Sequence, residues 1–353
     1  MCREWNNFIT NRLWRSPYGL RQLRGRLRGQ YFTEQPEESL LEVARGGVES
    51  QVWTCRADQK IVVCGLLNGT ANVFNTETKT LLTVLDCQSS GGTMRLCLSG
   101  NSIVAASSYG VISVWSRKDY GLIFRDHSLH QSEVTGVKMS DSLLITGDSC
   151  GVVICWTVSG PAVRSENLLV DEKRPVTDLD LRQDTILLGS LSSLRVGTLN
   201  KEGSLASLKL IKTDYILDCK LFHSFAISCG GKYRQGIQVW DLKSGALVRS
   251  LCSDLIFLSL EISNSLLYSV MCSSHLTYPH IYVIDIQSVR QNSGRSLKIR
   301  GFPCLQSNLL NTNICTSETK IFQAAGTELT ILEFWYYQVS HWDINTFLRA
   351  IKL

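Results

Sequence analysis

The sequence predicts an all-β fold built from seven repeated units. Beyond residue 50, short apolar and β-branched runs alternate with Gly, Ser, Asn and Asp, and helical periodicity is nearly absent. The runs end at equivalent positions 74, 115, 156 and 197, each 41 residues after the last. A period of about 40 to 45 residues with roughly four short strands per unit is typical of a β-propeller.

Each unit reads as an apolar strand, a tight turn and an alternating strand. The later equivalent positions, 240, 284 and 332, are spaced by 43, 44 and 48 residues because the turns lengthen. We therefore predict a seven-bladed propeller over residues 48–335. The strand pairs that define the seven units lie at 61–74, 103–115, 143–156, 186–197, 225–241, 266–285 and 321–333.

A propeller needs a closing strand, since an open ring leaves unpaired strand edges. The segment 39–47, SLLEVARGG, precedes the first unit and is expected to pair beside the strand that ends near Leu332. The tail 336–353 is expected to pack over this seam, with its aromatic residues as cover.

The units resemble WD repeats. His130 and Val134 match the His-x-x-x-Val entry to a blade, and Trp240-Asp241 is a literal Trp-Asp pair. In that family a His, a Ser or Thr, a Trp and a turn Asp form a hydrogen-bonded network that stiffens each blade. The turn Asp is replaced here by Asn68, Tyr109, Cys150 or Ser192, which implies incomplete networks. The resemblance assigns structural roles to His130, Thr146, Trp115, Trp156, Trp240 and Asp241.

The first residues predict an amphipathic helix that ends before Pro17 and Gly19. Its pattern resembles the third helix of the F-box, with a Cys-x-x-Trp and then a Leu-Trp pair. That resemblance implies contact with a Skp-type adaptor by Cys2, Trp5, Phe8, Ile9, Leu13 and Trp14. The earlier F-box helices would then lie upstream of Met1, in a longer gene product, or have been lost. A plain helix that caps the propeller is the alternative.

Residues 1–30 also hold most of the basic excess. The formal net charge is +5, and seven arginines lie within the first 28 residues. This basic linker is interpreted as a solvated face, with an anion- or partner-binding strip or a transit-like leader as alternatives. No aromatic stacking platform is interleaved with it, so no nucleic-acid partner is expected.

A partner-binding rim is predicted where the turns between second and third strands open. The two longest such turns are 230–236 and 272–280. Tyr and Arg side chains commonly anchor protein interfaces, and a cluster of cations favours an acidic or phosphorylated segment. The predicted rim residues are Tyr109, Lys232, Tyr233, Arg234, His275, Tyr278 and His280.

Catalytic and metal motifs are not found in the sequence. It has no Gly-x-Ser-x-Gly, His-Glu-x-x-His or phosphate-loop pattern, and His275 and His280 lack a nearby third ligand for zinc. The strands offer only dispersed acids such as Asp178, Asp180 and Asp218. Asp178 and Asp180, on one face of a strand, are interpreted as solvated or turn-pairing acids in preference to a general acid/base pair. We therefore expect no catalytic residue, metal or cofactor.

The 13 cysteines form no Cys-x-x-Cys pair, and the apolar runs are too short to span a membrane. We expect reduced thiols in a cytoplasmic, possibly nuclear, protein without membrane contact.

Together the two resemblances imply a non-catalytic substrate-recognition subunit of a Skp–cullin–F-box ubiquitin ligase, which binds protein substrates through the propeller rim. Two alternatives stay open. Trp240-Asp241-Leu242-Lys243 is similar to the Trp-Asp-x-Arg box that docks to a different cullin adaptor, although Lys lacks the planar fork of Arg. The chain could also be a scaffold unrelated to ubiquitin.

Overall fold

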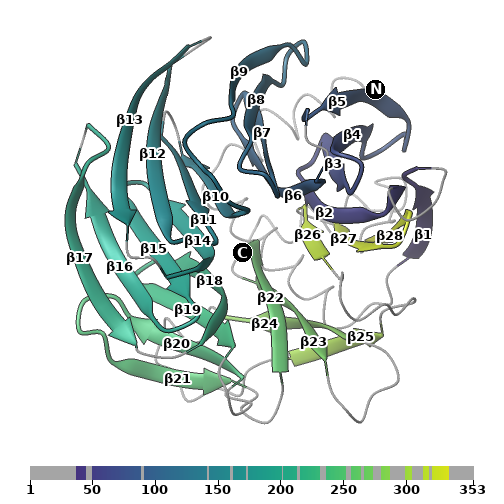
Figure 1. Ribbon diagram of the computed structural model, residues 1–353. Helices are drawn as coiled ribbons and strands as arrows, with labels where there is room; N and C mark the ends of the chain where they lie inside the picture. Colours follow the sequence, from purple (N-terminus) through teal and green to yellow (C-terminus); the bar gives the residue numbers. More distant parts are fainter. Residues whose placement is uncertain are drawn as a thin grey trace, which may run out of the picture.

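Seven four-stranded antiparallel sheets stand around a central axis like blades (Figure 1). The fold class predicted from the 41-residue period is confirmed. The computed structural model describes residues 37–44, 50–88, 91–140, 143–159, 162–171, 174–200, 202–212, 215–230, 236–251, 256–263, 266–272, 280–286, 299–303, 313–317 and 320–333.

Each of the first six blades consists of four consecutive strands, ordered from the central axis outward. Blades 1 to 3 contain β2 (Val52–Ala57), β3 (Ile61–Leu66), β4 (Thr70–Asn75) and β5 (Leu81–Asp86); β6 (Thr93–Ser99), β7 (Ser102–Ser107), β8 (Ile112–Ser116) and β9 (Leu122–Asp126); and β10 (Val134–Ser140), β11 (Leu143–Asp148), β12 (Val152–Ser159) and β13 (Ala162–Asp171). Blades 4 to 6 contain β14 (Val176–Arg182), β15 (Thr185–Ser190), β16 (Leu194–Leu199) and β17 (Leu205–Lys212); β18 (Ile216–Phe222), β19 (Phe225–Gly230), β20 (Ile237–Asp241) and β21 (Leu247–Leu251); and β22 (Ile256–Ser263), β23 (Leu266–Cys272), β24 (His280–Asp285) and β25 (Ile299–Pro303).

The seventh blade joins the two ends of the described chain. It consists of β26 (Asn313–Thr316), β27 (Lys320–Ala325), β28 (Glu328–Glu333) and, outermost, β1 (Glu37–Glu42). β1 pairs antiparallel with β28, with Leu40 opposite Thr330. This strand overlaps the first part of the 39–47 segment for which closure was predicted, and it lies beside the strand that contains Leu332.

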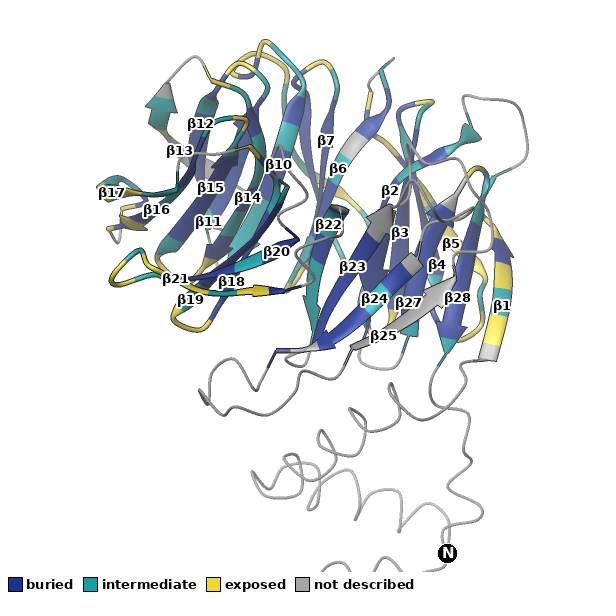
Figure 2. Cartoon of the chain, turned by 90° about the horizontal axis from the view of Figure 1, so that it is seen from below, coloured by how far each residue is buried: buried dark blue, intermediate teal, exposed yellow. Residues whose placement is uncertain are grey.

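The core lies between neighbouring blades. Every residue of β3 and β7 is buried, whereas the outer strands are partly exposed (Figure 2). One apolar cluster, for example, joins Val63 of blade 1 to Leu96 and Ile103 of blade 2. Apolar residues on both faces of each sheet therefore bury against the two adjacent blades, as a propeller requires.

The predicted F-box-like helix and basic linker in 1–30 and the tail 336–353 lie outside the described residues. Within the ranges given above, no helix is both long and apolar enough to traverse a bilayer.

Candidate functional site

The innermost strands carry charged side chains at repeated positions. In blades 1 to 6, β2, β6, β10, β14, β18 and β22 each contain a register shift near the start. The residues after this irregularity include Arg95, Asp178 and Asp218, and two positions further on stand Arg56, Lys138, Asp180, Lys220 and Glu261. These positions lie at the inner edge of the interface between one blade and the next.

The carboxylates at these positions accept hydrogen bonds from the backbone of the next blade. Asp178 accepts from the Cys219 amide at 3.3 Å, and Asp180 accepts from the Leu221 amide at 2.8 Å. Asp218 repeats the arrangement one blade later, with the Leu260 amide at 2.8 Å. An innermost strand has no further strand on its axial side, so its amides there need other partners. These acids therefore join the blades, and the interpretation of Asp178 and Asp180 as solvated or turn-pairing residues was wrong.

In blades 2 to 4, side-chain donors form hydrogen bonds with backbone carbonyls of the next blade. Arg95 Nε donates to the Thr135 carbonyl at 2.6 Å, and Thr135 Oγ1 donates to the Val176 carbonyl at 2.5 Å. The inner edge of the propeller is thus held by polar side chains that reach from one blade to the next.

Lys220 lies between two of the acids. Its Nζ is 2.6 Å from Asp178 Oδ2, and it also forms an ion pair with Asp218 Oδ1. Burial, followed by the charge of Asp178, raises the pKa of Asp218 to about 7. Burial opposes ionisation of Asp178 as well, but the charges of Lys220 and Lys138 and the hydrogen bonds of Asp178 to Asp218 and Lys220 together outweigh burial and hold the pKa of Asp178 well below its usual range. The protonation states of Asp178, Asp218 and Lys220 therefore depend on one another.

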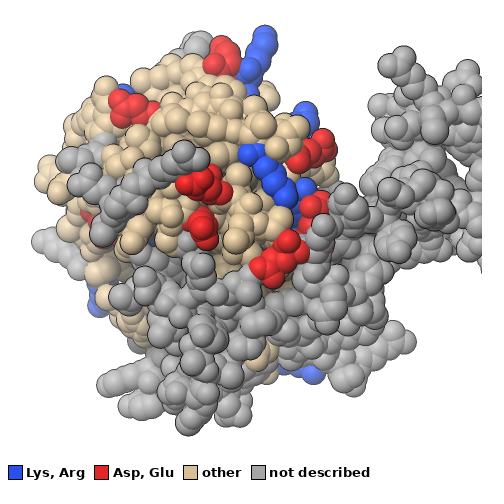
Figure 3. Space-filling view, turned by 90° about the vertical axis from the view of Figure 1, so that its right-hand side faces the viewer, with Lys and Arg blue, Asp and Glu red and all other residues tan. Residues whose placement is uncertain are grey.

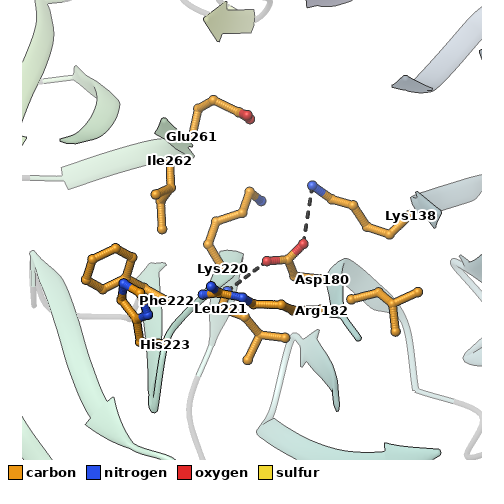
Figure 4. A pocket seen from close by; sticks show the side chains of 10 residues that line it. Lys138, Asp180, Arg182, Lys220, Leu221, Phe222, His223, Glu261 and Ile262 are labelled. Atoms are coloured by element: carbon orange, nitrogen blue, oxygen red, sulfur yellow. Dashed lines mark hydrogen bonds and ion pairs between the residues drawn. The ribbon is translucent and has the colours of Figure 1, made fainter. Parts of the chain in front are cut away.

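A pocket of about 350 Å³ opens beside this ion cluster (Figure 4). A neighbouring hollow of about 380 Å³ shares Arg182, Leu221 and His223 with it. Lys138 Nζ and Asp180 Oδ1 face each other across one side of the pocket at 3.3 Å. The pocket is lined by Lys138, Asp180, Leu181, Arg182, Lys220, Leu221, Phe222, His223, Glu261 and Ile262.

Two lining charges are available to a ligand. Arg182 is exposed, and its guanidinium makes no hydrogen bond or ion pair with any described residue. Glu261 is half-buried and likewise has no such partner in the described part of the chain. Although burial opposes it, the charge of Glu261 also acts at longer range on Arg56 and Lys138 and raises the pKa of both. A cation and a carboxylate that no described side chain pairs directly, next to apolar side chains such as Ile262, suit a partner segment that carries charges of both signs.

The turns at the pocket adopt backbone conformations that favour glycine. Gln183 has φ 56° and His223 has φ 54°, in the two-residue turns after β14 and β18. The same turn in blade 2 places Gly100 at this position, with φ 40°. Non-glycine residues in the left-handed region cost about 1–2 kcal/mol each. Such conformations concentrate at functional sites.

The pocket lies on the rim opposite to the predicted one. Successive turns of an antiparallel sheet alternate between its two ends, so first turns and second turns open on opposite rims. Tyr109 stands on the second-turn rim and is 65% exposed. The other predicted rim residues, Lys232, Tyr233, Arg234, His275 and Tyr278, lie outside the described residues. His280 begins β24, and its side chain is among those not described.

The hydrogen-bonded network of blade 3 is complete. His130 Nδ1 is 2.9 Å from Asp148 Oδ2, and His130 Nε2 is 2.7 Å from Thr146 Oγ1. Trp156 Nε1 donates to the same Thr146 oxygen at 2.9 Å. The sequence comparison placed Cys150 at the acidic position and implied an incomplete network, which was wrong for this blade. Asp148, two residues earlier, supplies the carboxylate.

The other assigned tryptophans lie in the core. Trp240 Nε1 donates to Ser228 Oγ at 3.1 Å, and Trp115 is buried with the Arg125 guanidinium 6.0 Å from its ring. Asp241 accepts from the Ser244 amide at 2.7 Å and so closes its turn. Trp240 and Asp241 of the Trp-Asp-x-Arg-like box thus make local structural contacts.

Within the described ranges, no group of three or more His, Cys, Asp or Glu side chains is arranged to hold a metal ion. The carboxylates of Asp178 and Asp218 both contact the Lys220 ammonium.

Several solved structures that resemble the chain are propellers, among them WD40 domains. The WD40 repeats of RRP9 superpose with a TM-score of 0.68 at 12% identity, covering 85% of this chain and 99% of that one. The Neurospora crassa Pan2 WD40 domain gives 0.62 at 12% identity, with coverage of 82% and 90%. The Myceliophteria thermophila Cps50 (Swd1) propeller gives 0.64 at 13%, with 84% and 99%.

The fold is that of a WD40 propeller. At these identities the likeness concerns the fold alone. No protein family and no curated protein matched the sequence.

Proposed function

We propose that this WD40 propeller is a non-catalytic scaffold that binds other proteins. We also propose that the pocket lined by blades 3 to 6 is a site where these proteins dock. The observation that carries the proposal is the pair of charges, Arg182 and Glu261, whose side chains line the pocket without a direct hydrogen bond or ion pair to a described residue. Around them the framework is held by inter-blade hydrogen bonds, and a preorganised surface lowers the entropic cost of binding.

The acids that could suggest catalysis support this proposal. Asp178 and Asp218 each accept a backbone amide of the next blade and also contact Lys220. A general acid or base must reach a substrate proton, and these oxygens are engaged by the protein itself. Their contribution is to stability.

Charge reversal at the pocket tests the scaffold proposal. Proteins bound by the full chain in cells are identified by proximity labelling and quantified for wild type and for Arg182→Glu/Glu261→Lys. We expect the double variant to lose partners that wild type captures. Lys118→Glu is the matched control, since Lys118 is an exposed cation in a turn of blade 2, away from the pocket. Unchanged capture by the pocket variant contradicts the proposal.

We further propose that the scaffold serves as a substrate receptor of a Skp–cullin–F-box ubiquitin ligase. The support is the F-box-like pattern Cys2-x-x-Trp5 with Leu13-Trp14, followed in the chain by a propeller. The gene product, including any in-frame residues encoded upstream of Met1, is tested for co-purification with a Skp-type adaptor and cullin. We expect Trp5→Ala/Leu13→Ala to abolish that association and to leave partners of the pocket bound. Absence of the adaptor overturns this proposal alone and leaves the scaffold proposal standing.

A further inference from the structure

The outer strand of blade 1 is an exposed apolar edge. In β5, Leu81, Leu82 and Val84 are 51%, 43% and 50% exposed. β5 is the last strand of the sheet β2-β3-β4-β5, and no other described strand pairs with its free edge. Such an edge is a template for pairing with another chain.

Charge distinguishes β5 from the other outer strands. Proteins commonly protect edge strands with charged side chains. Residues 81–85 of β5, LLTVL, contain none. Its last residue, Asp86, is charged, but its carboxylate accepts the Gln88 amide at 2.8 Å and its carbonyl accepts a hydrogen bond from the Arg125 guanidinium of blade 2, so the unoccupied part of the edge is the uncharged part. The outer strands of the other six blades each carry at least one charged residue: Arg125 in β9, Glu166 in β13, Lys209 in β17, Arg249 in β21, Arg300 in β25 and Glu38 in β1.

The register shows which backbone groups of β5 point outward. The Cys87 amide donates inward to the Gly69 carbonyl at 3.0 Å. Hydrogen-bonding direction alternates along a strand, so Leu85 and Thr83 also face β4, whereas Val84 directs its amide and carbonyl away from the sheet. The carbonyl of Leu82 also points away, and Leu82 has no partner residue in β4 because the register shifts there.

We propose that two copies of this chain associate by antiparallel pairing of their β5 strands. With Thr83 opposite Thr83 of the second copy on a two-fold axis, Leu82 of each copy faces Val84 of the other. The residues that point outward then exchange backbone hydrogen bonds, and the central threonines form a close non-hydrogen-bonded pair.

A second copy fits because the edge is complementary to itself. No like charges meet in this register, and a two-fold contact closes after two copies. Figure 3 shows the side of the molecule on which blades 7 and 1 lie, where charges of both signs stand next to one another and the described residues around them are mostly uncharged. One strand pair buries less surface than a standard interface, so the association should be weak and dependent on concentration.

Sedimentation equilibrium of the full chain measures this directly. We expect the average mass to rise from the monomer value of 39.5 kDa toward twice that value as concentration increases. Val84→Lys places a charge on the edge, and Val84→Pro removes an outward amide without removing a bond to β4. Both variants should remain monomeric at concentrations where wild type associates, with unchanged melting temperatures.

Blade 5 offers a matched control. The register between its outer strand β21 and β20 shifts at the same place as the register between β5 and β4. Ser250 therefore occupies the position in β21 that corresponds to Val84 in β5. Ser250→Lys and Ser250→Pro should therefore leave association intact. A wild-type chain that is monomeric at every concentration overturns the proposal, as does association that survives both Val84 variants or is equally lost in the Ser250 variants.

Discussion

Replacing Lys220 with Met should strongly destabilise the propeller. Lys220 is largely buried, with 6% of its side chain exposed, and it is the shared counter-ion of Asp178 and Asp218. Met retains most of the aliphatic volume but no charge. The variant therefore isolates the loss of the ion pairs from the loss of packing.

The expected cost is set by the two carboxylates that remain. Removing one partner of a buried ion pair costs about 3–5 kcal/mol, because an uncompensated charge stays behind. Here both acids also hold backbone amides of the next blade, through Cys219 and Leu260, and cannot turn away without breaking those bonds. Protonation of Asp218, whose pKa burial and Asp178 already raise to about 7, relieves part of the penalty. We expect a loss near the lower end of that range at neutral pH.

Urea unfolding followed by tryptophan fluorescence gives the change in free energy. Lys209→Met is the control, since Lys209 is exposed and its ammonium donates a hydrogen bond to the Lys243 carbonyl at 2.9 Å. This variant should cost less than about 0.5 kcal/mol. Adding Asp178→Asn and Asp218→Asn to Lys220→Met should recover most of the loss, because the buried charges are then gone. A loss of less than about 1 kcal/mol in the free energy of unfolding for Lys220→Met, or no recovery in the triple variant, would refute the inference that this ion cluster holds blades 4, 5 and 6 together.

Three further outcomes follow from the same structure. Because the pKa of Asp218 is raised from 3.8 to about 7 on folding, the native state binds the extra proton between these values. The wild-type urea midpoint should therefore fall as the pH rises from about 5 to about 8, and Asp218→Asn should flatten that dependence. Thr146→Val removes the hydroxyl shared by His130 and Trp156 and should lower the free energy of unfolding by about 1–3 kcal/mol, whereas Thr198→Val, which removes an exposed contact to Ser207, should change it little. Gly110→Ala should lower the melting temperature far more than Gly245→Ala. Both glycines have positive φ, 81° and 76°, but the added Cβ would meet the His130 carbonyl oxygen at 2.1 Å in the first case and only the end of the Lys209 side chain, at 3.6 Å, in the second.

The number and order of the blades could be predicted because the repeat consists of residue types at fixed positions within each unit. Each unit supplies a buried strand, a turn residue and an alternating strand at fixed offsets, and these patterns depend only on residues close in sequence. The network of blade 3 shows the limit of this reasoning. A family pattern places the acid at position 150, but the chain meets the same geometric need with Asp148, whose Oδ1 also accepts the amides of Cys150 and Val152 at 2.9 Å.

The pocket was missed for a different reason. The sequence directs attention to long turns with Tyr and Arg, which lie on the second-turn rim. The pocket is built instead from short first turns and from charges such as Glu261 and Arg182, which stand on different blades. Nothing local to either residue indicates that they share a cavity.

The length of the repeat could have been used to predict the hydrogen bonds between the innermost strands of neighbouring blades. In a propeller, one repeat along the sequence corresponds to one blade sideways in space, so residues one period apart lie at the same height in neighbouring blades. The contacts of the inner strands obey this rule. Arg95 reaches Thr135, 40 residues on, and Asp178 reaches Cys219, 41 residues on. Asp218 reaches Leu260, 42 residues on. A charged residue in an innermost strand can therefore be assigned a partner by adding one period to its number. Asp178 and Asp218, which look dispersed along the chain, then occupy the same level in neighbouring blades, and Asp180 occupies the level of Lys220.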